Sequence, residues 1–506
     1  MTSLANEAPD GARRLIGRTA VGTAWILIAR IAARFSDFIL LIVLTRLLSP
    51  ADFGLVAIAA SVVAILDVVT NLPMVTPLVR LEHVEKRHLD TAFTLGLIRG
   101  LIILALIGLL AIPIARFYGD PRLSSLLIVL SLSTVVRGLQ SPNMARLFKT
   151  LQYRQTFVIE IVGKCLGVAA AIGFGLATGS YWALVVSPIV SRIVGLPISY
   201  LYAPYRPALC LSEIRYFWDF LGWLFPSQII VAASWQFDRL FLGHFVAPAT
   251  LGLYSVASNL TSIIEQSIRT SVTNPLISGF VLAGSERERL QRGYVIADNA
   301  ILISAIPAYL ILFFFAEPLV LLAFGENWLS VVPLLKWLAL AQVPALFRIP
   351  FRPLAMAVGR TDYVFIVSVC SLLLRIPAVA VGWFVAGIEG VIFGIGISAV
   401  LVAAVAMFYI RRITKISLTK QLAGSWRILS ATVPAALIAW PATVVLHGLT
   451  GLTLAVALAG ACLAVSIVYF GTIFLLWYSS GLPDGVEAKI MVQLRALLRK
   501  ARVGAR

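Results

Sequence analysis

Residues 30–77 read RIAARFSDFILLIVLTRLLSPADFGLVAIAASVVAILDVVTNLPMVTP, two long apolar runs on either side of one short polar turn. Each run approaches the roughly 20 apolar residues that an α-helix needs to cross a bilayer. Pro50 follows Ser49 in the turn, and proline is favoured in the first turn of a helix because it lacks a backbone N–H that would stay unbonded there. The stretch therefore predicts two membrane helices joined by a tight turn at residues 49–52.

Charged side chains interrupt this apolar stretch at Arg30, Arg34, Asp37 and Asp67. A charge at the centre of a membrane helix costs about 2.5–3.5 kcal/mol on insertion scales. We therefore expect these side chains to face a cavity or a charged partner. Arg30, Arg34 and Asp37 share one helix face because they are spaced i, i+4 and i+7.

The rest of the chain has a similar composition. Of its 506 residues, 60% are hydrophobic and only 13% are charged, which predicts an all-α polytopic membrane protein. The apolar runs are too long and too continuous for the strands of a membrane barrel. We expect about fourteen spans, at residues 20–46, 52–79, 91–115, 122–141, 156–178, 181–203, 219–243, 251–281, 293–316, 331–354, 362–385, 388–410, 428–447 and 452–478.

Basic residues are concentrated in alternate loops, while the loops between them carry few. The net charge is +18, and the positive-inside rule explains it without a nucleic-acid partner. The pattern predicts an even number of spans with both termini in the cytoplasm. We expect no cleavable signal peptide, because residues 1–19 are polar and basic and no cleavage-site pattern follows.

The sequence carries no motif for nucleotide hydrolysis and no set of metal ligands. It contains neither a Walker A motif nor G-x-S-x-G, and its histidines form no ligand spacing. The cysteines are scattered without a C-x-x-C pair, so we interpret them as packing residues. We therefore expect a transporter without a cofactor and not an enzyme.

An internal repeat relates the opening stretch to a segment in the middle of the chain. The matching pairs are Pro50 and Pro248, Gly54 and Gly252, Asp67 and Glu265, and Pro77 and Pro275. A similar turn recurs at residues 117–120 and 324–326. Because six predicted spans separate the copies, both have the same orientation, which is typical of transporters with parallel repeats. We expect two six-helix lobes, with substrate bound between them near the midplane and access alternating by rocking of the lobes.

This arrangement predicts seven segments. They are a cytoplasmic N-terminus (1–19), an N-lobe (20–203), a cytoplasmic linker (204–218), a C-lobe (219–410), a basic cytoplasmic loop (411–427), an extra helix pair (428–478) and a basic tail (479–506). In the tail, apolar residues fall on one helical face with Lys and Arg opposite. This pattern predicts an interfacial helix on the anionic inner leaflet, with a solvated basic tail as the alternative.

With this layout the chain resembles the multidrug/oligosaccharidyl-lipid/polysaccharide (MOP) exporter superfamily. Residues 30–59 are similar to the opening of its polysaccharide-transporter branch, the O-antigen, lipopolysaccharide and exopolysaccharide flippases. Further similar segments are YRPALCLSEIRYFWDFLGWLFPSQ (205–228), DRLFLGHFVAPATLGLYSVA (238–257) and FGENWLSVVPLLKWLAL (324–340). The resemblance covers essentially the whole chain. It implies a bacterial inner-membrane flippase for undecaprenyl-diphosphate-linked oligosaccharide, working with membrane lipids and with the polymerase and glycosyltransferases of the same pathway.

The resemblance also implies a cationic cavity. Lipid II flippases of the superfamily use arginines of spans one, two and eight for the diphosphate. Here span one supplies Arg30 and Arg34, and span eight supplies Arg269. Span two departs from that pattern because it offers only Asp67, which puts a direct transfer of the diphosphate site in doubt.

We sort the charged residues of the spans into three groups. The candidate cavity residues that bind substrate are Arg30, Arg34, Arg192, Arg269 and Arg375. The candidates for ion coupling or for a charge network are Asp37, Asp67, Asp238, Arg239, Glu160, Lys164 and Glu265. Arg348 and Arg352, beside two prolines that would break the helix, are candidates for a cytoplasmic mouth.

Each group has a structural alternative. Glu265 with Arg269, and Glu160 with Lys164, are spaced i, i+4 and could be structural pairs. Asp37 could neutralise an arginine of its own helix. A buried acid in each lobe would suit coupling to a proton or cation gradient, because burial raises the pKa of a carboxyl group.

Three other functions compete with the flippase. A multidrug or other small-molecule exporter of the same superfamily would need an acidic cavity for cationic drugs, whereas bases outnumber acids in these spans. A polymerase or glycosyltransferase would carry a large loop or a soluble domain, and the sequence has neither. A structural scaffold would not need so many charges within its spans.

Overall fold

The computed structural model describes residues 32–70, 78, 84–149, 153–216, 224–284, 286–482, 485–488 and 491. The regular structure within these ranges is helical, with no strand, which confirms the all-α prediction. Arg30 and most of the predicted tail helix lie outside the described residues. The chain divides into two compact units, one ending at Ser255 and the other beginning at Val256.

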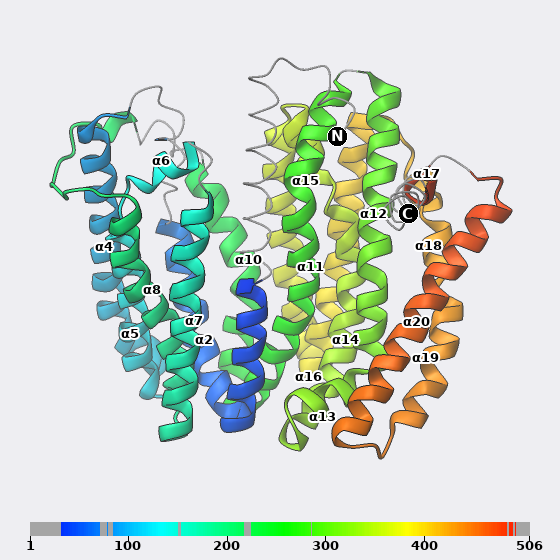
Figure 1. Ribbon diagram of the computed structural model, residues 1–506, viewed down its shortest axis with the longest axis horizontal. Helices are drawn as coiled ribbons and strands as arrows, with labels where there is room; N and C mark the ends of the chain where they lie inside the picture. Colours follow the sequence, from blue (N-terminus) through cyan, green and yellow to red (C-terminus); the bar gives the residue numbers. More distant parts are fainter. Residues whose placement is uncertain are drawn as a thin grey trace, which may run out of the picture. The chain divides into compact units, whose positions relative to one another are not determined.

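The first unit contains the helices that correspond to the first seven predicted spans (Figure 1). A helix over residues 32–47 is followed by α2 (Pro50–Thr70), α4 (Lys86–Tyr118), α5 (Arg122–Gly138), the short α6 (Met144–Lys149), α7 (Tyr153–Thr178), α8 (Ala183–Tyr202) and α10 (Leu224–Phe245). The main helix pairs are α4 with α5, α7 with α8, and α2 with α10. The next helix, α11 (Pro248–Ala283), begins in this unit and continues into the second.

The second unit has more interrupted helices. They are α12 (Arg287–Phe314), α13 (Ala316–Ala323), the 3₁₀ helix η1 (Glu326–Val331), α14 (Val332–Gln342), the 3₁₀ helix η2 (Val343–Arg348), α15 (Phe351–Ala357), α16 (Thr361–Thr414), α17 (Leu418–Ala423), α18 (Trp426–Ser430), α19 (Thr432–Leu446) and α20 (Gly451–Ser479).

Two of these interruptions have clear causes in the sequence. The predicted break beside Pro350 is confirmed, because η2 ends at Arg348 and α15 begins at Phe351. The long helix α16 leaves helical geometry at Ala386 and Gly387, where Gly387 has a φ of 59°. This bend lies between two predicted spans, 362–385 and 388–410, so α16 contains both.

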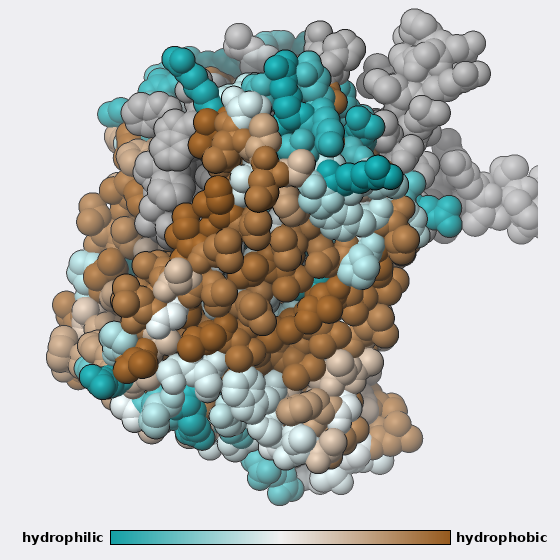
Figure 2. Space-filling view, turned by 90° about the vertical axis from the view of Figure 1, so that its left-hand side faces the viewer, coloured by the Kyte–Doolittle hydropathy of each residue, from teal (hydrophilic) through white to brown (hydrophobic). Residues whose placement is uncertain are grey.

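The described helices are those of a multi-pass membrane protein. Nine of them are long and apolar enough to cross a membrane, α16 among them with 54 residues. Figure 2 shows hydrophobic residues gathered in a broad band on one face, with hydrophilic residues above and below that band. Such a band is expected where hydrocarbon, and not water, surrounds the protein.

The turn before α2 has the predicted form. The Ser49 Oγ accepts a hydrogen bond from the backbone N–H of Asp52 at 3.4 Å. The Asp52 carboxylate in turn accepts one from the backbone N–H of Ser49 at 3.0 Å. These reciprocal bonds satisfy N–H groups that the first turn of the helix leaves open. At the matching position of the repeat, α10 ends at Phe245 and α11 begins at Pro248.

The two repeated turns touch each other through their glycines. A Cβ on Gly54 would lie 1.8 Å from the Pro248 carbonyl oxygen, and a Cβ on Gly252 would lie 1.8 Å from the Pro50 carbonyl oxygen. Only glycine allows helix backbones to approach this closely. The two contacts have the same distance and exchange equivalent residues. They therefore confirm that Pro50 aligns with Pro248, and Gly54 with Gly252, in the internal repeat.

Candidate functional site

Three helices of the first unit bring two arginines to one carboxylate. Arg99 of α4 donates from Nη2 to Asp67 Oδ1 of α2 at 2.5 Å, and to the Asp67 backbone oxygen at 3.2 Å. Arg137 of α5 donates from Nη1 to the other carboxylate oxygen, Oδ2, at 3.0 Å. Asp67 therefore has a guanidinium group on each oxygen, and its side chain is 24% exposed.

Close contact between α4 and α5 places the two arginines together. A Cβ on Gly138 would lie 2.3 Å from the Gly96 carbonyl oxygen, and a Cβ on Gly100 would lie 2.8 Å from the Val135 Cα. Arg99 precedes Gly100 and Arg137 precedes Gly138, so both guanidinium groups start from the zone where the backbones meet. The glycines are thus part of how the sequence builds the site.

A third arginine adds positive charge to the same cluster. Arg192 of α8 interacts electrostatically with Arg137, Asp67 and Glu160. Its helix packs against α7 through small residues, since a Cβ on Gly163 would lie 2.7 Å from the Ser191 carbonyl oxygen. We call Asp67, Arg99, Arg137 and Arg192 the arginine cluster. Three guanidinium groups and one carboxylate leave it with a clear excess of positive charge.

Other predicted residues of the first unit make contacts of their own or are partly buried. Asp37 forms a salt bridge with Lys164 of α7, joining the helix over residues 32–47 to that helix. Arg34 lies about one turn before Asp37 and is partly buried. Asp238 of α10 is buried and accepts from the Tyr254 hydroxyl at 3.3 Å, while Arg239 is partly buried.

In the second unit the repeat counterpart of Asp67 also holds an arginine. Glu265 of α11 is buried, and its Oε1 lies 3.4 Å from Nη2 of Arg348 in η2. Arg269 lies one turn after Glu265 and is partly buried. Arg352 is exposed on α15, and Arg375 is partly buried on α16. The structure thus pairs Arg348, predicted at the mouth, with an acid predicted for coupling.

Sequence reasoning did not select Arg99 or Arg137 as site residues. Arg137 lies toward the end of its predicted span, 122–141, where a basic residue is ordinary, and Arg99 lies about two turns inside the span 91–115. The usable signal was the neighbouring glycines, since Gly96, Gly100 and Gly138 mark a close helix–helix contact beside each arginine.

The chemistry available to the arginine cluster is anion binding. A guanidinium group presents paired N–H donors that match carboxylate and phosphate oxygens, and it stays charged even in apolar surroundings. Among the described residues no group of three His, Cys, Asp or Glu side chains is placed to hold a metal ion.

Comparison with known proteins adds sequence relatives. The chain is 23% identical over 440 residues to the "Lipopolysaccharide biosynthesis protein WzxC" of Escherichia coli (strain K12), covering 85% of this chain and 89% of that protein. It is 24% identical over 360 residues to the "Succinoglycan biosynthesis transport protein ExoT" of Rhizobium meliloti (strain 1021), covering 71% of this chain and 73% of that protein.

Solved structures with the same fold include two transporters. "Lipid II flippase MurJ, inward closed conformation" has a TM-score of 0.64 at 14% identity, covering 91% of this chain and 99% of that one. An inward-facing multidrug resistance MATE family transporter of the MOP superfamily has a TM-score of 0.62 at 17% identity, covering 77% and 98%. These likenesses confirm the MOP-type fold.

A family model also matches this chain, and its description agrees with the names of the sequence relatives. Residues 43–333 match the model of a family described as "Polysaccharide biosynthesis protein", which is more than half of the chain. The protein therefore belongs to the polysaccharide biosynthesis protein family.

Proposed function

We propose that this protein is a flippase that moves undecaprenyl-diphosphate-linked oligosaccharide units across the bacterial inner membrane for surface polysaccharide synthesis. The observation that carries the proposal is the arginine cluster, in which one carboxylate holds two guanidinium groups between membrane helices. A diphosphate is the anionic part of such a substrate, and arginine forks suit its oxygens. The family match and the names of the relatives support the same substrate class.

Each member of the cluster has a role in this proposal. Arg137 is the most exposed of the Asp67 partners, with 34% of its side chain accessible, so it would meet the diphosphate first. Arg99 is almost fully buried and would hold Asp67 in place. Arg192 adds a third guanidinium charge, and it also interacts with the carboxylate of Glu160. Arg34, Arg269 and Arg375 remain candidates for contacts along the substrate's path.

The transport cycle we propose is alternating access of the N-lobe (20–203) and the C-lobe (219–410), with both termini in the cytoplasm. Rocking of two repeats around a central site is the usual mechanism of transporters with parallel repeats. A proton or cation gradient would drive the cycle, and the polymerase and glycosyltransferases of the pathway would supply and consume its substrate. A multidrug exporter is the weaker alternative, because a cluster rich in arginine repels cationic drugs.

The test is to delete the gene in the bacterium that carries it and to measure in which leaflet lipid-linked sugars accumulate. We expect intermediates facing the cytoplasm, rescued by the natural protein but not by Arg99→Ala or Arg137→Ala. Arg122→Ala is the matched control, because Arg122 is exposed and pairs locally with Asp120 at 2.7 Å. Normal export of polysaccharide in the deletion strain would refute the proposal.

A further inference from the structure

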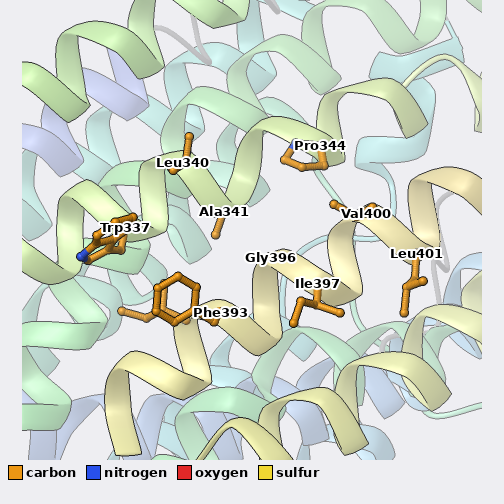
Figure 3. Close-up of a pocket in the computed structure, with 10 residues that line it drawn as sticks. Trp337, Leu340, Ala341, Pro344, Phe393, Gly396, Ile397, Val400 and Leu401 are labelled. Carbon is orange, nitrogen blue, oxygen red and sulfur yellow. The ribbon is translucent and has the colours of Figure 1, made fainter. Parts of the chain in front are cut away.

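A buried acid of the second unit has no part in the function proposed above. Asp298 of α12 is 2% exposed, and it contacts Ser425 in the loop between α17 and α18. By contrast, the pocket between α14 and α16 is lined, among the described residues, by no charged side chain that would select a ligand (Figure 3). A carboxyl group removed from water needs a compensating cation or a proton. The surroundings of Asp298 therefore indicate what it binds.

Polar side chains fasten the stretch from the end of α16 to α18 onto α12. Gln291 of α12 donates from Nε2 to the Thr414 carbonyl oxygen at 2.7 Å, and the Tyr294 hydroxyl donates to Gln421 Oε1 at 3.2 Å. Gln421 in turn donates from Nε2 to the Met407 carbonyl oxygen at 3.1 Å. Each of these contacts joins a donor to an acceptor, so none of them needs a further hydrogen.

The contacts of Ser425, in the same stretch, do need one. Its Oγ lies 3.3 Å from Asp298 Oδ2 and 3.0 Å from Asn299 Oδ1. Asn299 turns this oxygen toward Ser425 because its Nδ2 donates to the Gly424 carbonyl oxygen at 3.3 Å, and the reverse orientation would bring two acceptor oxygens together. A serine hydroxyl carries a single hydrogen, so Ser425 cannot serve both acceptors at once.

A proton on Asp298 completes this arrangement. Asp298 would then donate to the Ser425 Oγ, and Ser425 would donate to Asn299 Oδ1, so that each contact contains one hydrogen. With an ionised Asp298, either the buried charge or the Asn299 oxygen is left without a donor. Asp298 Oδ1 has no hydrogen-bond partner in the described ranges. An uncharged oxygen in that position costs far less than an ionised carboxylate.

The charged groups near this site supply no cation for Asp298. Tyr294, one turn earlier on α12, interacts with it electrostatically, and no charged side chain in the described part of the chain acts on it. Arg427 of α18 forms a salt bridge with Glu487 at 3.3 Å, and α19 and α20 contain no charged residue. Further bases on neighbouring elements are either exposed or, as with Arg348, paired with Glu265; the exposed ones are Arg292, Arg352, Arg411, Arg412, Lys415 and Lys420.

We propose that Asp298, Asn299 and Ser425 form a proton-binding site that locks the loop between α17 and α18 onto α12. The proton is the link between Asp298 and Ser425 in a chain of hydrogen bonds that ends at the Gly424 carbonyl oxygen. Its loss would leave a buried charge without compensation and loosen the loop, which leads from α16 to the α19–α20 pair. The proposal does not depend on the flippase function.

Infrared spectroscopy of the full-length protein in nanodiscs tests whether Asp298 carries the proton. A protonated carboxylic acid has a C=O stretch at a higher frequency than the bands of a carboxylate. At neutral pH we expect this acid band in the natural protein and a loss of intensity in Asp298→Asn. Asp362→Asn is the matched control and should leave the band unchanged, because Asp362 is exposed and pairs with Arg360 at 2.7 Å.

Hydrogen exchange tests whether the proton fastens the loop. Asp298→Asn offers an N–H donor to Ser425, so the amides of residues 418–425 should keep their natural protection. Asp298→Ala and Ser425→Ala each remove one end of the contact, and exchange there should become about tenfold faster. Raising the pH until the acid band disappears should have the same effect on the natural protein, after correction for the intrinsic pH dependence of exchange, but not on Asp298→Asn.

Three results would overturn the proposal. An acid band equal in the natural protein and in Asp298→Asn at neutral pH would show an ionised carboxylate. An acid band that appears only when choline chloride replaces sodium chloride would assign a sodium ion to the site. Unchanged protection of the loop after the acid band has been titrated would show that the proton does not lock it. The deletion experiment tests the flippase function separately, and none of these results alters its expected outcome.

Discussion

Asp67 and Glu265 occupy the same position of the repeat, yet each unit uses its acid differently. Asp67 holds two arginines, at 2.5 and 3.0 Å, and its side chain is 24% exposed. Glu265 is 7% exposed, and its salt bridge is to Arg348 at 3.4 Å. The first acid therefore holds guanidinium groups from two other helices, while the second holds the guanidinium group of Arg348 in η2. The internal repeat thus keeps an acid at the same position in both units, although the partners of that acid differ.

The sharpest way to break this comparison is to remove each acid. Asp67→Asn leaves two guanidinium groups without their carboxylate, and loss of one partner of a buried ion pair costs about 3–5 kcal/mol. We expect Asp67→Asn to lower the free energy of unfolding by about 3 kcal/mol and Glu265→Gln to lower it by about half as much. Thermal unfolding of the purified proteins measures both losses. If both acids instead serve ion coupling, both variants would keep their stability and lose only gradient-dependent transport.

A second test moves the arginines without changing any charge. Gly138→Ala places a methyl group 2.3 Å from the Gly96 carbonyl oxygen, and overpacking of this kind costs about 1–3 kcal/mol. We expect about 2 kcal/mol of destabilisation together with loss of export, because Arg137 would be pushed away from Asp67. Gly108→Ala on α4, which has open space around it, is the control and should be neutral in both assays.

A third test compares arginine with lysine in the two units. Arg99→Lys keeps the charge but loses the planar fork that contacts both the side chain and the backbone of Asp67. We expect a three- to tenfold drop in export, a cost of about 1 kcal/mol. Arg348→Lys should export at nearly the natural rate, because one ammonium group still matches Glu265. An equal loss in both variants would show that the units do not differ.

The smallest effect is expected at the local pair of Arg122 and Asp120, whose side chains are 52% and 17% exposed. Its loss gives a reference value for the loss of the more buried pairs. Hydrogen bonds from Arg122 hold the pKa of Asp120 below its usual value of 3.8. A carboxyl group with a lowered pKa in the folded state contributes stability above pH 4 and loses it as the pH falls further. We expect Asp120→Asn to lower the free energy of unfolding by less than 1 kcal/mol at neutral pH. Below pH 4 the stability of this variant should depend less on pH than that of the natural protein.

Much of the fold followed from local patterns in the sequence. The positions of the spans, the turn before Pro50 and the break beside Pro350 each depend on a few neighbouring residues. Apolar length, proline and glycine act over such short distances, so one sequence is enough to predict them. The all-α membrane fold is confirmed for the same reason.

The charge pairs could not be predicted in this way. Spacing along one helix suggested that Glu265 pairs with Arg269, whereas the structure adds Arg348, 83 residues away. Asp37 and Lys164 meet across two helices, and Arg99 and Arg137 meet at Asp67 because glycines draw α4 and α5 together. These partners depend on helix packing, which a periodic pattern does not specify.

The contact between Gly54 and Gly252 has a consequence for the history of the chain. Each glycine faces the carbonyl of the proline that begins the other's helix, at the same spacing of 1.8 Å for an added Cβ. Reciprocal contact of equivalent residues is the mark of an interface between two identical subunits related by a two-fold axis. The present chain keeps such an interface inside a single polypeptide, as a duplicated and fused dimer would. Neither glycine can gain a side chain unless the opposite backbone shifts, so the two copies constrain each other's evolution at this point even where the rest of their sequences have diverged.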